Sequence, residues 1–344
     1  MGYSHKHTPE GVTSAVVPPV FIVGCIRSGT TILHRMLSAF SPNCIDLDDG
    51  DFECRPFWQN RGFHIGSALT GTRCQGCDGT ELGVDMRDEI RNALQSRTSG
   101  NRHVVTKNPH LANKIGLVNA CFPDARFVHI VREPMAVVAS TKLRFLEQDG
   151  ARINPWGVRF VQYWPDDDEL PCWWTVPVDA GCEFREPWKV RLKKYWQGRP
   201  PLTPPRHHDA ELFQREHPDR SRYYPGDGFK RIPESWLKIN ANIVRQIDRH
   251  GLQDRYMAVN YADVVTQLRP TLARIAEFAG IQATNPAAVP EVLDESRSHK
   301  WKTDLKPDER RMVLEAAESF EAEAELIRNR LPGRLLEAPA HTFS

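Results

Sequence analysis

A glycine-containing loop, GCIRSGTT at residues 24–31, carries the residues best suited to bind an anion. It follows a short apolar segment and precedes apolar residues at helical spacing, which indicates the order strand, loop, helix. Backbone N–H groups and the helix dipole favour an anion at such a point. Gly29 leaves room for an oxyanion, and Thr30 and Thr31 offer hydroxyl groups. Arg27 adds a planar fork of donors that matches phosphate or sulfate oxygens.

The loop departs from the pattern of nucleotide triphosphatases at one position. That pattern, G-x-x-x-x-G-K-[ST], uses its Lys to reach the β and γ phosphates and its hydroxyl residue to hold Mg²⁺. Here Thr30 occupies the position of the Lys, and Arg27 lies three residues earlier. The loop is therefore suited to hold an anion without a metal ion. A plain turn glycine before a helix is the structural alternative.

The elements that must position this loop follow from the hydrophobic pattern. Strands alternate with helices, which indicates a parallel sheet. The predicted strands are 20–25, 104–105, 126–131 and 256–261, and the predicted helices are 29–40, 110–121, 135–146, 234–249, 268–279 and 307–328. After a flexible tail of residues 1–17, we expect one α/β domain over residues 18–344. We expect three α/β/α layers, with a central parallel sheet between two layers of helices, as in P-loop nucleotide hydrolases.

Residues 147–231 interrupt this alternation. They are rich in Pro, Trp and charged residues and show no periodicity. We expect a long insertion on the acceptor side of the domain. Its tryptophans can stack on a sugar, a phenol or an apolar natural product, or they can form a small core of the insertion itself.

Composition excludes several protein classes. The chain has 45 Lys and Arg against 44 Asp and Glu, so it lacks the basic excess of a dedicated nucleic-acid binder. No apolar stretch approaches the roughly 20 residues that cross a bilayer, and the N-terminus lacks the apolar core of a secretory signal. Eight cysteines in 344 residues favour reduced thiols in a cytoplasmic protein. A zinc ion or a disulfide at Cys74 and Cys77 is the alternative.

Four segments together resemble the sulfotransferases that use 3′-phosphoadenosine 5′-phosphosulfate (PAPS). They come in the family's order and spacing: RSGTT at 27–31, ARFVHIVREPMAVVAS at 125–140, NYADVV at 260–265 and SHKWKTDL at 298–305. The resemblance covers about 18–146 and 234–305. It implies in-line transfer of a sulfuryl group from PAPS, the co-substrate, to a hydroxyl of a small-molecule, carbohydrate or natural-product acceptor. It implies no metal.

The resemblance also implies which residues hold the 5′-phosphosulfate. The matching loop residues are Arg27, Ser28, Gly29, Thr30 and Thr31. The cytosolic branch of the family has Lys where this chain has Arg27. The substitution keeps the positive charge and the donors, so Arg27 would stabilise the leaving phosphate electrostatically.

Further matches concern the nucleoside and its 3′-phosphate. Arg132 and Ser140 match the family's ligands of the 3′-phosphate, and Tyr261 matches a tyrosine of the adenine pocket. The Arg-Lys-Gly loop of the cytosolic branch is absent here. The cations that are candidates to replace it precede Trp301: Arg297, His299 and Lys300.

Sulfuryl transfer also needs a base and a cation beside the reacting oxygens. Lys107 resembles the family's lysine and is assigned to the bridging and sulfuryl oxygens. Two residues are alternatives for the base. Enzymes of the tyrosylprotein and polysaccharide branch use a Glu after their second strand; Glu53 resembles it and is preferred, because the segment CIDLDDGDFE is expected at the mouth of the sheet. His110 comes three residues after Lys107, whereas the cytosolic branch has its His two residues after the Lys.

Two other function classes stay open at this point. A P-loop phosphotransferase similar to nucleotide kinases would use Mg²⁺ and a loop lysine, which this chain lacks. A non-catalytic nucleotide-binding module would use Arg27, Arg132 and Ser140 to hold its ligand, with Lys107 and the base idle.

Overall fold

The computed structural model of the protein describes most of the chain between residues 17 and 336. The described residues are 17–45, 57–58, 82–98, 102–145, 158–163, 172–177, 231–333 and 335–336. Glu53, Cys74, Cys77 and most of the segments 1–17 and 147–231 lie outside this part of the chain. Every structural statement below refers to the described residues.

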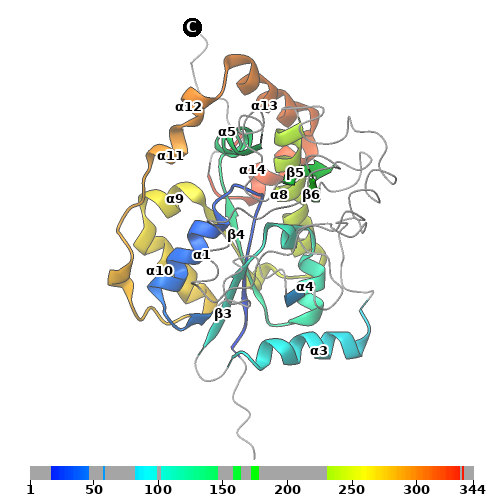
Figure 1. Ribbon diagram of the computed structural model, residues 1–344, viewed down its shortest axis with the longest axis vertical. Coiled ribbons are helices and arrows are strands. Elements are labelled where there is room, and N and C mark those ends of the chain that lie inside the picture. Colours follow the sequence, from blue (N-terminus) through cyan, green and yellow to red (C-terminus); the bar gives the residue numbers. More distant parts are fainter. Residues whose placement is uncertain are drawn as a thin grey trace, which may run out of the picture.

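A parallel five-stranded sheet in the order β2-β3-β1-β4-β7 forms the centre of the fold (Figure 1). Its strands are β1 (Val20–Val23), β2 (Cys44–Ile45), β3 (His103–Lys107), β4 (Arg126–Val131) and β7 (Tyr256–Asn260). The first strand lies in the middle, with β3 on one side and β4 on the other. The strand order therefore reverses at β1. Open α/β sheets bind ligands beyond the carboxyl ends of the strands at such a point.

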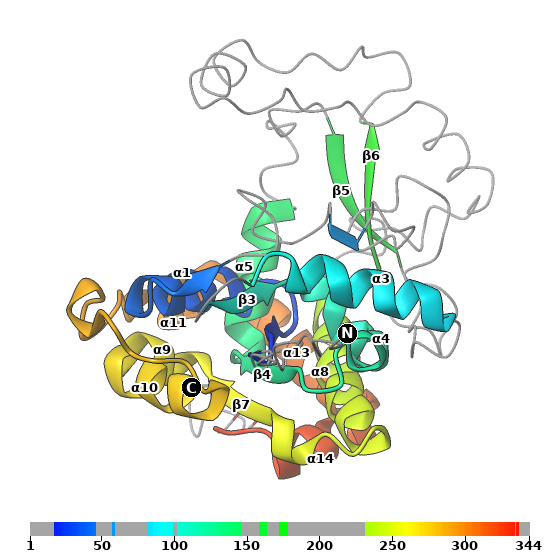
Figure 2. The same cartoon turned by 90° about the horizontal axis from the view of Figure 1, so that it is seen from below.

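Helices cover both faces of the sheet, and the residues of β1 show why. Val20 and Ile22 pack with α1 (Thr30–Phe40) and α10 (Leu268–Ala279), whereas Phe21 and Val23 pack with α4 (Ile115–Cys121) and α8 (Arg231–Arg249). A strand that is buried on both faces has a continuous apolar sequence, here VFIV. Figure 2 shows α1 and α10 on one side of the strands and α4 and α8 on the other. The predicted three-layer α/β/α fold is confirmed.

Further elements complete the described part of the chain. The helices are α3 (Val84–Gln95), α5 (Pro134–Phe145), α9 (Tyr261–Thr266), α11 (Ser296–His299), α12 (Trp301–Asp304), α13 (Pro307–Ser319) and α14 (Glu321–Arg330). Short 3-10 helices are η1 (Pro109–Asn113), η4 (Gln253–Arg255) and η5 (Pro286–Ala288). An antiparallel pair, β5 (Val158–Tyr163) and β6 (Cys172–Pro177), falls within the segment for which the sequence shows no periodicity. No helix in these ranges is long and apolar enough to cross a membrane.

Two predicted helices are each divided in the structure. The pattern predicts one helix at 110–121, but Lys114 has φ −136° and ψ 32° and separates η1 from α4. The pattern also predicts one helix at 307–328, but Phe320, with φ −116° and ψ 53°, separates α13 from α14. Apolar spacing continues across both breaks, so periodicity alone does not reveal them.

The boundary between β7 and α9 also differs from the prediction. The pattern predicts a strand to residue 261, but the strand ends at Asn260, whose side chain accepts a hydrogen bond from the Ala262 N–H at 2.9 Å. This is an N-cap, and it makes Tyr261 the first residue of a helix. Helix α3 is not predicted either, because its buried residues are only Ile90 and Leu94. Two buried apolar positions are too few to show a helical period in the sequence.

Candidate active site

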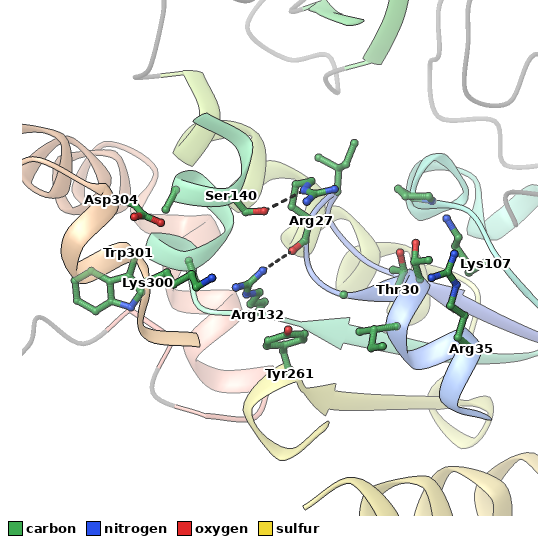
Figure 3. Close-up of a pocket in the computed structure, with 17 residues that line it drawn as sticks. Arg27, Thr30, Arg35, Lys107, Arg132, Ser140, Tyr261, Lys300, Trp301 and Asp304 are labelled. Atoms are coloured by element: carbon green, nitrogen blue, oxygen red, sulfur yellow. Dashed lines mark hydrogen bonds between the residues drawn. The ribbon is translucent and has the colours of Figure 1, made fainter. Parts of the chain in front are cut away.

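The carboxyl ends of four strands meet at one edge of the sheet. Ile22 of β1 pairs with Lys107 of β3, and Val131 of β4 pairs with Asn260 of β7. The residues at and after these ends therefore border one region. A cavity of about 530 Å³ lies there (Figure 3), within the size range of small-molecule sites.

Positive charge dominates the wall of this cavity. Among the described lining residues are five cations and one carboxylate: Arg27, Arg35, Lys107, Arg132, Lys300 and Asp304. The wall also contains five uncharged residues that the sequence assigned to the nucleotide: Gly29, Thr30, Thr31, Ser140 and Tyr261. A cleft with such an excess of one charge attracts an anionic ligand.

The loop before α1 is held in a conformation that requires glycine. Gly29 has φ 103°, and a Cβ added to it would lie 2.5 Å from the ring of Tyr261. Gly24 has φ 155°, and a Cβ there would lie 2.5 Å from the carbonyl oxygen of Ile130. The loop is thus pressed against β4 and the start of α9. Ser28 is fully buried, and its Oγ has no hydrogen-bond partner among the described residues.

Hydrogen bonds join this loop to the residues assigned to the 3′-phosphate. Arg27 Nε donates to Ser140 Oγ at 3.1 Å, and Arg132 Nη1 donates to the carbonyl oxygen of Arg27 at 3.2 Å (Figure 3). The guanidinium of Arg132 lies 4.5 Å from the centre of the Tyr261 ring. Tyr261 therefore packs against both Gly29 of the loop and the guanidinium of Arg132, and it helps to hold both in place.

A chain of hydrogen bonds among largely buried side chains fixes the backbone carbonyl of Arg132. Trp236 Nε1 donates to the Arg132 carbonyl at 3.0 Å, and Asn240 Nδ2 donates to the Trp236 carbonyl at 2.7 Å. His129 Nε2 donates to Asn240 Oδ1 at 2.9 Å, so His129 Nδ1 accepts from the Tyr256 hydroxyl at 2.8 Å. Burial lowers the pKa of His129 to about 4, which keeps the ring neutral.

Lys107 ends β3 on the other side of the loop. Its side chain is buried and lines the cavity. Helix α1 is fixed to this strand because His34 Nε2 donates to the Val105 carbonyl at 3.0 Å. Burial lowers the pKa of His34, and the charges of Lys107 and Arg35 lower it further. The last of these, Arg35, is absent from the sequence-based site, although it lies four residues after Thr31 and therefore on the same face of α1.

Lys300 and helix α12 line the opposite end of the cavity. Trp301 Nε1 donates to Glu133 Oε2 at 3.0 Å. Lys142 Nζ donates to the Asp304 carbonyl at 3.0 Å and forms an ion pair with Glu309 at 2.9 Å. These contacts hold α12 against α5.

The three cations considered for this end differ in position. Lys300 lines the cavity, whereas His299 faces Glu295 at 3.9 Å. Arg297 belongs to α11, but its side chain lies outside the described residues. Lys300 is therefore the one of the three that the structure shows in the cavity wall, and the assignment of Arg297 stays a prediction.

The two candidate bases stay predictions as well. Glu53 lies outside the described residues. His110 belongs to η1 and directly follows Pro109, which lines the cavity, but its side chain is not among those described.

Several solved structures that are similar to this chain are sulfotransferases. Among solved structures, the sulfotransferase domain from the Synechococcus PCC 7002 olefin synthase shares 17% identity over 88% of this chain and 94% of that chain, with a TM-score of 0.41. A sulfotransferase from Alicyclobacillus acidocaldarius shares 15% identity over 91% and 95%, with a TM-score of 0.44. Mouse sulfotransferase SULT7A1, complexed with PAP, shares 11% identity over 91% and 89%, with a TM-score of 0.36.

The match to a protein family covers the loop and further polar residues of the cavity. No curated protein sequence matches the chain. Residues 18–173 match the model of the sulfotransferase family, and this segment includes Lys107, Arg132 and Ser140. The resemblance noted in the sequence is therefore confirmed by this match to the sulfotransferase family over residues 18–173.

Proposed function

We propose that this protein transfers the sulfuryl group of PAPS to a hydroxyl group of an acceptor. The match of residues 18–173 to the sulfotransferase family supports sulfuryl transfer. The observation that carries the choice of donor is a single cavity lined by loop residues of 24–31, Lys107, Arg132 and Ser140. PAPS has two separate anionic groups, and this cavity offers cations from several elements of the fold.

Each anionic group of PAPS has a matching part of the cavity. The phosphosulfate fits the loop at the start of α1, where backbone N–H groups and the hydroxyls of Thr30 and Thr31 would donate hydrogen bonds to it. The 3′-phosphate fits Arg132, Ser140 and Lys300 on the side of β4 and α12. The Arg27–Ser140 hydrogen bond joins the two regions, and we expect both side chains to exchange it for phosphate oxygens.

The reaction that these residues support is an in-line displacement. The acceptor oxygen forms a bond to sulfur, the bond between sulfur and the bridging phosphate oxygen breaks, and 3′-phosphoadenosine 5′-phosphate (PAP) leaves with the bonding electrons. Lys107 neutralises charge on the bridging and sulfuryl oxygens, and Arg27 stabilises the leaving phosphate. The hydroxyl proton passes to Glu53 or His110.

The first test is nucleotide binding without metal. We expect PAP to bind in the presence of EDTA, because the cavity's cations are side chains. Isothermal titration calorimetry with PAP, and with AMP as the matched nucleotide without the 3′-phosphate, measures this directly. Loss of PAP binding in EDTA, together with binding of ATP in Mg²⁺, would contradict the proposal and favour a phosphotransferase.

Substitution of Arg132 tests the 3′-phosphate site. Arg132→Ala should weaken PAP binding by about 1.5 to 3 kcal/mol, the usual range for a hydrogen bond to a charged group. The effect should be much smaller for AMP, which differs from PAP only by lacking the 3′-phosphate. Calorimetry with both nucleotides checks this, with Arg126→Ala on the same strand as a control outside the cavity wall. Equal weakening of PAP and AMP would remove Arg132 from the 3′-phosphate site.

A further inference from the structure

One cation of the cavity has no role in the donor scheme above. Arg27, Lys107, Arg132 and Lys300 are assigned to the two anionic groups of PAPS, which leaves Arg35. This arginine belongs to the second turn of α1 and is exposed, yet it lines the same cavity.

The packing of α1 explains how Arg35 reaches the cavity. Thr31 and Arg35 are four residues apart and both line the cavity, so one face of α1 forms part of its wall. The hydrogen bond from His34 to the Val105 carbonyl fixes this helix against β3, the strand that ends in Lys107. Arg35 directly follows His34, and Lys107 comes two residues after Val105, so this hydrogen bond brings the two cations into one neighbourhood.

The direction of in-line attack decides which substrate meets Arg35. Figure 3 shows Arg35 and Lys107 at one end of the cavity and Lys300 and Trp301 at the other. A donor with its 3′-phosphate near Lys300 and its sulfuryl group near Lys107 leaves the Lys107 end for the acceptor. The attacking oxygen must approach sulfur from the side opposite the leaving phosphate.

We propose that Arg35 binds an anionic group of the acceptor, so that the preferred acceptors carry a carboxylate, phosphate or sulfate beside the hydroxyl that is sulfated. This inference rests on the proposed sulfuryl transfer and specifies its substrate class. A guanidinium presents two parallel N–H donors, which match the oxygens of a carboxylate or a phosphoryl group. Arg35 then determines specificity and takes no part in bond formation.

Matched acceptor pairs test this role. Each pair has the same hydroxyl and differs only in charge, as in p-hydroxyphenylacetate against p-hydroxyphenylacetamide, or a methyl glucuronide against the corresponding methyl glucoside. Binding to the protein saturated with PAP is measured by calorimetry, and KM is measured with PAPS for those acceptors that react. We expect the unsubstituted protein to prefer the charged member by about 5- to 20-fold, since water partly screens an exposed arginine.

Two variants and a control separate recognition from stability. Arg35→Gln should abolish the preference for the charged acceptor, and Arg35→Lys should restore part of it because it keeps the charge without the fork. Arg311→Gln makes the same charge change on α13, where the side chain pairs with Glu315, and should keep the full preference. If Arg35 serves only an ion pair within the chain, Arg35→Gln will lower Tm and leave the preference unchanged, which overturns the proposal.

The same samples distinguish failure of this inference from failure of the proposed function. PAP affinity in EDTA should be equal in Arg35→Gln and the unsubstituted protein, within about twofold, because the donor scheme does not use Arg35. If PAP binds but the unsubstituted protein shows no preference within any acceptor pair, the role of Arg35 is overturned and the proposed function stands. If PAP does not bind at all, the proposed function itself fails.

Discussion

Lys107→Met should lower kcat by roughly 10²- to 10³-fold while the protein keeps its fold and most of its affinity for PAP. The ammonium group is assigned to the oxygens that gain charge in the transition state, and loss of one such donor has an effect of this size. Methionine keeps the length and the apolar packing of a side chain that is only 3% exposed. Steady-state kinetics with saturating PAPS measures the change, and thermal unfolding checks the fold.

Two further variants sharpen the Lys107 experiment. Lys107→Arg should recover part of the lost rate because it keeps the charge. Recovery should be incomplete, because a guanidinium is larger than an ammonium and has a different shape. Lys238→Met removes a lysine of α8, which lies over the Phe320 ring, and should leave kcat unchanged. A Lys107→Met protein with normal kcat would show that Lys107 does not act on the reacting oxygens.

The base should show the largest effect of all. If Glu53 takes the proton, Glu53→Gln should keep the fold and the PAP affinity but lower turnover by roughly 10²- to 10⁴-fold, because the amide has the shape of the carboxylate without its basicity. His110→Ala should then have a much smaller effect. Kinetics with saturating PAPS and the same acceptor compares the two variants.

The pH dependence distinguishes the two bases independently. A carboxylate base gives kcat/KM an acidic limb near pH 4 to 5, whereas a histidine base places that limb at roughly pH 6 to 7. If His110 is the base, the two mutational effects exchange. Near-normal rates in both variants would contradict both assignments and direct attention to the aspartates of residues 46–51.

The fold could be predicted from the sequence because its strands are short, apolar and separated by helical periods. The segment VFIV of β1 is buried on both faces, and this produces the continuous apolar run that the sequence shows. Element ends were harder to predict, since they depend on single residues. Asn260 caps α9 through one side-chain hydrogen bond, and Phe320 divides two helices without any change in apolar spacing.

The candidate site was predictable where residues follow strand ends and less so elsewhere. Lys107, Arg132 and the loop of residues 24–31 each follow or end a strand, so sequence position alone brought them to one edge of the sheet. Arg35 reaches the cavity from α1, and Lys300 from the turn before α12, so their positions depend on how α1 packs on β3 and α12 packs on α5. Such packing between elements cannot be read from the spacing of apolar residues in the sequence.

Transfer of radiolabelled sulfuryl from PAPS, measured in EDTA with a panel of hydroxyl acceptors, tests the central claim most directly. The predicted result is label in an acceptor and an equal amount of PAP released, with the rate of both lowered roughly 10²- to 10³-fold in Lys107→Met. The panel includes the charged and uncharged acceptor pairs. The claim is contradicted if no acceptor gains label from PAPS while radiolabelled ATP with Mg²⁺ phosphorylates one of them, or if PAPS binds and no transfer occurs to any acceptor.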